Sequence, residues 1–510
     1  MLTAEDIRTI EVEQARSELR AIEGEFARRR WLADPEAWAQ ERLGMTLWSQ
    51  QRKTLRAIRD HRRVAIPSCH EVSKTHTAAM ACCWWLDCHL QGEAFVVTSA
   101  PTDHQVRAVL WREIGRMHAK GLRGRVNQTE WHLKMPGGNE ELIAFGRKPS
   151  DYNPTAFQGI HARFVLLVLD EASGIMKLLW EAADSLIAND YSKALAIGNP
   201  DDPQAEFAEV CKPGSGWYVE SIGAFDSPNF TGEALPEEIK QHLIGRTYVE
   251  EKRKKWAPQW RWTEDGSRCV PPKDQKVEDS HPFWQAKILG IFPRVVSENA
   301  LIPYAWVKAA QDRSLPRIGT STLGVDVGGG GDESTGCHNQ NGICRILWSD
   351  QNPDTMHTCG VMVAHLKDPL LAVTEAHVDV IGIGKGLVDR AVELNSLGEL
   401  AVPVYGINVG ETPLDTERFI NRRAEDYWDL RTKFENGLID LDPNDEDTAA
   451  ELVSIRYKRL SNGKIQIESK LEAKSRGVPS PNRADSIMLS NSKPRDGYGP
   501  MAVVKMAGFH

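Results

Sequence analysis

The feature that constrains the fold most is the stretch 164–173, FVLLVLDEAS. Its first six residues are apolar and rich in β-formers, and Asp170 and Glu171 follow at once. A short run of this kind predicts a strand buried on both faces, as in a parallel sheet. The C-terminal end of such a strand opens onto the ligand crevice of an α/β sheet, where two adjacent carboxylates are costly unless they serve chemistry.

This pair of carboxylates suits hydrolysis of a nucleoside triphosphate. Asp170 would hold Mg²⁺, directly or through water, and Glu171 would orient and polarise the attacking water. The structural alternative is a buried strand that simply ends in a helix-capping aspartate, because Asp is a common N-cap residue.

A phosphate-binding loop is predicted at residues 68–75, SCHEVSKT, between a short strand and a helix. The layout of strand, tight loop, Lys-Thr and helix is the one that cradles phosphates. Lys74 would contact the β- and γ-phosphates, and Thr75 would bind Mg²⁺. Both glycines of the usual GxxxxGK pattern are serines here, Ser68 and Ser73, and a non-glycine residue at positive φ costs roughly 1–2 kcal/mol. The alternative is a surface Lys-Thr pair at a helix start.

Two further polar residues lie where a nucleotide would bind. Gln51 opens a helix and could read an adenine edge, because its amide both donates and accepts; otherwise it is a solvated helix residue. Asn199 ends the apolar stretch ALAIGNP at 194–200 and is placed to sense the γ-phosphate, or it belongs to a plain Asn-Pro turn.

The C-terminal half carries three separated acids. Asp326 lies in a predicted strand that runs into a glycine-rich turn, which is how an RNase H-like fold begins. Asp379 ends another apolar stretch, and Asp485 stands in the first turn of a late helix. Acids on separate elements can converge on two divalent ions that clamp an in-line phosphodiester displacement. Taken alone, Asp485 is an ordinary helix-start carboxylate.

At 510 residues the chain is too long for one ordinary core. The predicted fold class is α/β. An N-terminal P-loop ATPase domain with a mostly parallel sheet spans 1–297, including a lid or linker subdomain at about 201–297. A linker region at 298–320 leads to a C-terminal RNase H-like α/β nuclease domain at 321–490, and 491–510 form a tail.

Charge and composition narrow the class of protein. The net charge of −9 does not by itself indicate a nucleic-acid binder, yet 451–510 carry 11 Lys+Arg against 5 Asp+Glu. The basic aromatic segment 252–262, KRKKWAPQWRW, either contacts nucleic acid or is a solvated helix end.

No apolar run approaches the roughly 20 residues of a membrane span. The first 40 residues predict a charged helix and no secretory signal. Nine cysteines without regular spacing favour a reducing compartment.

Together these motifs resemble the large terminase subunit of tailed bacteriophages, over about 48–489. The motifs are WSQQ, SCHEVSKT, TSAPTDHQV, LLVLDEA, IGNP, GIFP and the three acids. The resemblance implies a motor that translocates double-stranded DNA into the prohead by ATP hydrolysis and cuts concatemeric DNA when packaging starts and ends. It implies ATP with Mg²⁺ in one domain and two divalent ions, Mg²⁺ or Mn²⁺, in the other.

The resemblance also assigns residues to roles. Relatives often carry an arginine at the position of Gln158, so an arginine finger would come from Arg163 or Arg147. The loop residues Ser68 and Ser73 would line the phosphates. The remaining roles are the adenine site for Gln51, the phosphates for Lys74 and Thr75, the Walker B pair for Asp170 and Glu171, coupling for Asn199, and the nuclease metals for Asp326, Asp379 and Asp485, with Asp332 as a further acid.

The implied partners are double-stranded DNA, a small terminase subunit, the portal protein and further copies in a homo-oligomeric ring, with no membrane. The implied location is the cytoplasm of the infected bacterial host rather than the mature virion. Three alternatives remain at this stage: a P-loop DNA translocase or helicase that does not cleave, a structural capsid or portal component whose motifs have decayed, and a recombination nuclease with an ATP-dependent clamp.

Overall fold

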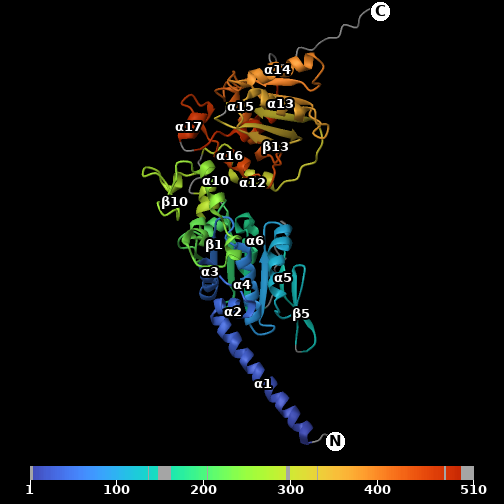
Figure 1. Cartoon of the computed structure of the whole chain (residues 1–510), viewed down its shortest axis with the longest axis vertical. Helices are drawn as coiled ribbons and strands as arrows, with labels where there is room; N and C mark the ends of the chain where they lie inside the picture. The colour runs from blue at the N-terminus through green and yellow to red at the C-terminus, as the bar shows by residue number, and fades with distance from the viewer. Residues whose placement is uncertain are drawn as a thin grey trace, which may run out of the picture. The chain divides into compact units, whose positions relative to one another are not determined.

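The computed structural model describes residues 4–135, 137–147, 162–203, 205–293, 299–329, 331–475 and 478–495. The chain forms two compact units, made mainly of residues 1–294 and 295–510 (Figure 1). Among the described residues, no helix is both long enough and apolar enough to cross a lipid bilayer.

The first unit is built on an eight-stranded sheet with the order β3-β4-β5-β2-β6-β7-β1-β8. The strands from β5 to β8 pair in parallel, whereas β3, β4 and β5 pair antiparallel. The predicted mostly parallel sheet is therefore confirmed. Its strands are β1 (Arg63–Pro67), β2 (Ala94–Ser99), β3 (Arg125–Asn127), β4 (Glu130–Lys134), β5 (Glu140–Gly146), β6 (Phe164–Asp170), β7 (Lys193–Gly198) and β8 (Tyr218–Val219).

Helices and a small two-stranded sheet complete this unit. The helices are α1 (Ala4–Ala33), α2 (Pro35–Leu43), α3 (Ser49–Asp60), α4 (Lys74–Cys88), α5 (Trp111–His118), α6 (Lys177–Leu186), α7 (Glu206–Val210), α8 (Pro228–Thr231), α9 (Glu237–Lys240), α10 (Arg246–Trp256) and α11 (Pro282–Trp284). The small sheet pairs β9 (Arg261–Trp262) with β10 (Cys269–Val270).

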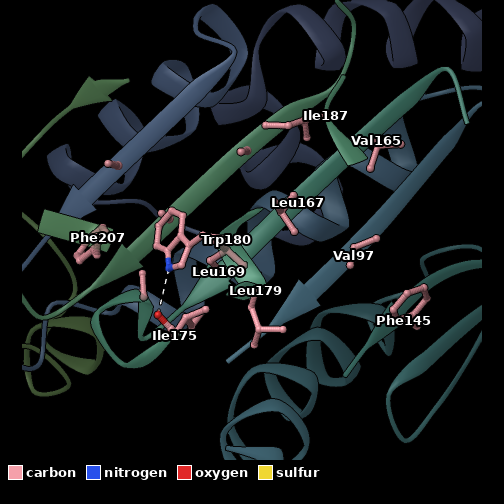
Figure 2. Close-up of a cluster of buried hydrophobic side chains, with 14 residues drawn as sticks. Val97, Phe145, Val165, Leu167, Leu169, Ile175, Leu179, Trp180, Ile187 and Phe207 are labelled. Atoms are coloured by element: carbon pink, nitrogen blue, oxygen red, sulfur yellow. Dashed lines mark hydrogen bonds between the residues drawn. The ribbon is translucent and has the colours of Figure 1, made fainter. Parts of the chain in front are cut away.

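Strand β6 lies in the middle of the sheet and is buried on both faces, as its sequence predicts. Val165, Leu167 and Leu169 point into one core cluster together with Trp180 of α6 (Figure 2). The alternate residues are buried as well, and α4 contacts β2, β6 and β7. Because apolar packing surrounds the strand, Asp170 at its end is held in a fixed position.

The basic aromatic segment does not offer its tryptophans to a ligand. Trp260 is buried and meets Trp284 edge to face, with ring centroids 5.5 Å apart. Trp262 stacks on Phe230 at 6.1 Å. These rings stabilise the region around β9 and are not free to stack on bases. The sequence alone did not decide whether these tryptophans are buried or available to stack on a ligand.

The second unit contains a five-stranded sheet with the order β13-β12-β11-β14-β15. β12 runs antiparallel to both β11 and β13, whereas β11, β14 and β15 are parallel. This mixed sheet has the strand arrangement of the predicted RNase H-like fold. Its strands are β11 (Ser321–Asp326), β12 (Ser334–Gln340), β13 (Ile343–Asp350), β14 (Glu375–Asp379) and β15 (Val404–Ile407), and a separate pair joins β16 (Tyr457–Arg459) to β17 (Ile465–Ile467).

The helices of this unit are α12 (Tyr304–Gln311), α13 (Thr355–Leu366), α14 (Gly384–Ser396), α15 (Arg422–Glu435), α16 (Glu446–Ser454), α17 (Lys470–Ser475) and α18 (Asn482–Asn491). α12 contacts α15 and α16, so the stretch predicted as a linker region, 298–320, contains an ordered helix of the second unit. α18 packs on β11 and β12. A Cβ on Gly324 of β11 would lie 2.2 Å from the Ser486 carbonyl oxygen, so only glycine allows this close approach.

Candidate nucleotide and metal sites

The loop between β1 and α4 is tied to the sheet by its backbone. Ser68 N donates to Gly198 O at 2.9 Å, and Cys69 N donates to Ile222 O at 2.8 Å. Of the two serines that replace the usual glycines, only Ser73 takes a positive φ, at 60°. The departure from glycine therefore carries strain of about 1–2 kcal/mol at Ser73, and none of this kind at Ser68.

Lys74 and Asn199 meet at this loop. Lys74 Nζ donates to Cys69 O at 3.0 Å and to Asn199 Oδ1 at 3.3 Å. Asn199 Nδ2 in turn donates to Ser68 O at 2.7 Å. The amide of Asn199, at the end of β7, thus joins the loop backbone to the lysine ammonium. A plain Asn-Pro turn would not require these contacts.

Thr75 and Asp170 are brought together, although 95 residues separate them in the chain. Thr75 Oγ1 donates to Asp170 Oδ2 at 3.0 Å. Asp170 is buried, and burial together with the charge of Glu171 raises its pKa to about 7. A hydroxyl beside a buried carboxylate at the end of a central strand is the donor set that holds Mg²⁺ in P-loop proteins.

Glu171 lies at a sharp turn directly after β6. Its φ of 49° and ψ of 48° are left-handed, a conformation that non-glycine residues rarely adopt. A Cβ on Gly198 of β7 would lie 2.7 Å from Ala172 N, so the glycine lets this turn close against the neighbouring strand. Strained backbone at the end of a central strand is typical of functional sites.

The other nucleotide-site predictions have weaker structural support. Gln51 is buried, and its Oε1 accepts from Trp48 N at 3.3 Å at the start of its own helix, so its adenine role stays a prediction. Arg147 follows β5 at the same sheet edge as Asp170, because β5, β2 and β6 are parallel. Arg163 precedes β6 and lies at the opposite edge, where it packs over Tyr191. Gln158 lies outside the described residues.

The second candidate site joins three acids in the second unit. Asp326 ends β11 and Asp379 ends β14, and these two strands are parallel neighbours. Asp485 projects from the first turn of α18. Burial raises the pKa of Asp326 to about 7, and the charges of Asp485 and Asp379 act in the same direction, whereas the charge of Lys470 lowers it. Burial also raises the pKa of Asp379 to about 6.

Basic and hydroxyl groups that the sequence did not reveal complete this cluster. Lys470 Nζ lies 3.5 Å from Asp326 Oδ2 and 3.2 Å from Asp485 Oδ2. Arg423 Nη2 donates to Asp485 Oδ1 at 3.2 Å, and Tyr427 donates to the same oxygen at 2.6 Å. Burial alone would raise the pKa of Asp485, but Arg423 and Lys470 outweigh it and hold that pKa below its usual value.

Among the described residues, no three acid, histidine or cysteine side chains are arranged so that they could hold one metal ion together. The lysine ammonium stands between two of the carboxylates instead. The predicted fourth acid, Asp332, is paired with Lys474 at 3.3 Å. The donor chemistry nevertheless suits hard divalent cations, because Asp326 and Asp485 lie 3.5 and 3.2 Å from the same Lys470 Nζ and Asp379 ends the strand next to that of Asp326.

The chain matches no protein-family profile and no curated protein. Among solved structures, it is similar to a mutant nuclease domain of the large terminase subunit gp2 of bacterial virus Sf6 with manganese, at 21% identity over 38% of this chain and 100% of that chain, with a TM-score of 0.33. It is also similar to the large terminase of the thermophilic bacteriophage D6E, at 12% identity over 87% of this chain and 98% of that chain, with a TM-score of 0.38.

The D6E protein in complex with ATP-gamma-S gives 13% identity over the same shares of the two chains, with a TM-score of 0.36. These solved structures are all structures of large terminases.

Proposed function

We propose that this chain is the large subunit of a viral genome-packaging motor, in which ATP hydrolysis drives translocation of double-stranded DNA and a metal-dependent endonuclease cuts it. The observation that carries the proposal is the presence of two distinct sites in one chain. One is the Thr75–Asp170 pair beside Lys74, and the other is the cluster of Asp326, Asp379 and Asp485.

In the first site each residue has a defined task. The Lys74 ammonium neutralises the phosphates, and Thr75 and Asp170 would hold Mg²⁺, which offsets the charge that develops on the β- and γ-oxygens. Glu171 orients the attacking water and accepts its proton. Because burial raises the pKa of Asp170 to about 7, loss of its proton accompanies metal binding near neutral pH.

Asn199 is the residue that would report the state of the nucleotide. Its amide already contacts both Lys74 and the loop backbone at Ser68 O. When the Lys74 ammonium turns toward the phosphates, a phosphate oxygen replaces Asn199 Oδ1 as its partner. Asn199, at the end of β7, is then free to change its position. This exchange offers a local link between hydrolysis and movement.

In the second site Asp326, Asp379 and Asp485 would hold two divalent ions, Mg²⁺ or Mn²⁺, which would supply an activated water and stabilise the leaving oxygen. Lys470 competes with these cations, because it lies 3.5 and 3.2 Å from two of the carboxylates. Tyr427 holds Asp485 in place through a hydrogen bond of 2.6 Å.

The same proposal names the binding partners and the place of action. The partners are double-stranded DNA, a small terminase subunit, the portal protein and further copies in a ring, and the place of action is the cytoplasm of the infected bacterium. Arg147 is the better of the two finger candidates, because it follows β5 at the sheet edge that carries Asp170.

The direct test incubates the purified full-length chain with supercoiled plasmid and Mn²⁺ or Mg²⁺, with and without ATP. We expect phosphate release that depends on ATP and Mg²⁺, and plasmid cleavage that depends on the divalent metal. ATP turnover without cleavage under any metal would instead favour the non-cleaving DNA translocase. Absence of both activities would contradict the proposal.

A further inference from the structure

Asn482 has a buried amide that contacts Asp326, one of the three acids of the candidate nuclease site. It begins α18, three residues before Asp485, and it is only 5% exposed. Residues three apart on a helix lie on the same face. Because α18 packs on β11, the first turn of this helix brings an amide as well as a carboxylate to the end of that strand, where Asp326 lies.

The neighbours of this amide determine its orientation. Asn482 Nδ2 donates to Asp326 Oδ2 at 3.2 Å, and Asn482 Oδ1 accepts from Glu333 N at 3.1 Å. The reverse orientation would set two acceptors against each other on one side and two donors on the other. The amide therefore connects the carboxylate of Asp326 to the backbone just before β12.

Backbone contacts hold Asn482 in this place. Thr335 Oγ1, in β12, donates to Asn482 O at 2.7 Å, and Asn482 N donates to Ser480 O at 3.0 Å. The strand β12 pairs with β11, which carries Asp326. Asn482 and the acid are thus fixed to neighbouring strands of one sheet. A buried donor that is held in this way restricts the orientation of the carboxylate that it contacts.

Lys470 and Asn482 contact the same oxygen of Asp326 but differ in mobility. Lys470 Nζ lies 3.5 Å from Asp326 Oδ2 and 3.4 Å from the amide atom of Asn482 that faces this oxygen. The Lys470 side chain is 40% exposed, so the ammonium can withdraw into water when a divalent ion arrives, whereas the buried amide stays. Within the described part of the chain, the polar contacts of this carboxylate gather on Oδ2, which leaves Oδ1 for a metal ion.

We propose that Asn482 is a positioning residue of the nuclease site, whose Nδ2 holds Asp326 Oδ2 so that Oδ1 faces the divalent ion. This inference rests on the proposed nuclease function and concerns how one of its metal ligands is held. Groups that orient a ligand without touching the metal typically change metal affinity or activity by about 10- to 100-fold when they are removed. Asn482 thus acts on the metal through Asp326.

The test titrates the full-length protein with Mn²⁺ and follows both plasmid cleavage and the melting temperature. Asn482→Ala should raise the Mn²⁺ concentration at half-maximal cleavage about 10- to 100-fold, and the concentration at half-maximal thermal stabilisation by a similar factor. Asn339→Ala is the matched control, because Asn339 is also a buried amide of this unit. Its Nδ2 donates to Ser490 O and its Oδ1 accepts from Gly342 N, both at 3.0 Å. This variant should keep both Mn²⁺ concentrations at the wild-type values, whatever its melting temperature without metal.

Asn482→Asp keeps the fold if the alanine variant does not. An aspartate retains the shape and an oxygen for Glu333 N, and its charge suits the start of a helix, but it cannot donate to Asp326. We expect the required Mn²⁺ concentration to stay raised in this variant, because a second carboxylate at 3.2 Å repels that of Asp326.

Three results would overturn the positioning role. The first is a wild-type Mn²⁺ requirement in Asn482→Ala or Asn482→Asp, and the second is an equal shift in Asn339→Ala, which would mean that any buried amide of this unit has the same effect. The third is a lower Mn²⁺ requirement in Asn482→Asp, which would mean that this side chain binds the metal directly. Failure of the proposed nuclease is distinguishable, because the wild type would then not cleave at any Mn²⁺ concentration, while the melting titration would still decide the role of Asn482.

Discussion

Replacing Gly324 by alanine should displace α18 and with it Asp485. The added Cβ would lie 2.2 Å from Ser486 O and 2.3 Å from Ser490 N, whereas ordinary contacts begin at 3.4 Å. Both atoms belong to helix backbone, so the helix must withdraw by about 1 Å, and overpacking of this kind costs about 1–3 kcal/mol of unfolding free energy. A displacement of about 1 Å at a reacting group lowers a rate on the order of 100-fold.

The assay measures plasmid cleavage with Mn²⁺, phosphate release from ATP and thermal unfolding on the same protein preparation. Gly324→Ala should lose cleavage and keep ATP turnover, because its contacts are confined to the second unit. Gly360→Ala is the matched control: no atom lies within 4 Å of its Cβ position in α13, and alanine favours a helix by up to about 1 kcal/mol. Wild-type cleavage by a stable Gly324→Ala protein would refute the reasoning.

Four further outcomes are expected. Ser73→Gly should keep ATP binding, and relief of left-handed strain should raise the unfolding free energy by about 1 kcal/mol; loss of nucleotide binding in a titration would contradict this. Metal-dependent cleavage should rise from about pH 5.5 to pH 8, because Asp326 and Asp379, with pKa values of about 7 and 6, must lose protons to bind cations. As the pH rises from about 4 to 7, the metal-free protein should become less stable, because the folded Asp326 and Asp379 hold protons that the unfolded chain has already lost. A melting temperature that does not change over this range would argue against the raised pKa values. Glu451→Ala should lower the unfolding free energy by about 1–2 kcal/mol, because its carboxyl group, whose pKa burial raises to about 8, accepts from two backbone N–H groups at the start of α18. Glu451→Gln, which keeps an accepting oxygen without a charge, should restore most of this loss in a denaturant titration.

The elements that sequence predicted well are those with a strong local signal. The apolar run that ends at Asp170 forms a central strand, because six consecutive apolar side chains are removed from water only when both faces of the strand are buried. The Lys-Thr pair became the start of α4, and Thr75 meets Asp170 because parallel strands and their following loops share one sheet edge.

Features that depend on tertiary packing could not be predicted in this way. Lys470 reaches Asp326 across 144 residues, and neither its own sequence neighbourhood nor any spacing indicates the contact. Arg423 and Tyr427 lie on one helix four residues apart, a common pattern on a solvated face, and only the position of Asp485 gives it meaning. The buried state of Trp260 was equally hidden, because basic neighbours in sequence suggested exposure.

The measurement that tests the central claim most directly is a paired assay on Glu171→Gln and Asp326→Asn. Each substitution removes one charge and keeps the side-chain volume nearly unchanged. If one chain carries two separate sites, Glu171→Gln abolishes phosphate release and still cuts plasmid with Mn²⁺, whereas Asp326→Asn hydrolyses ATP normally and loses cleavage by orders of magnitude. Wild-type phosphate release by Glu171→Gln, or wild-type cutting by Asp326→Asn, would contradict the account.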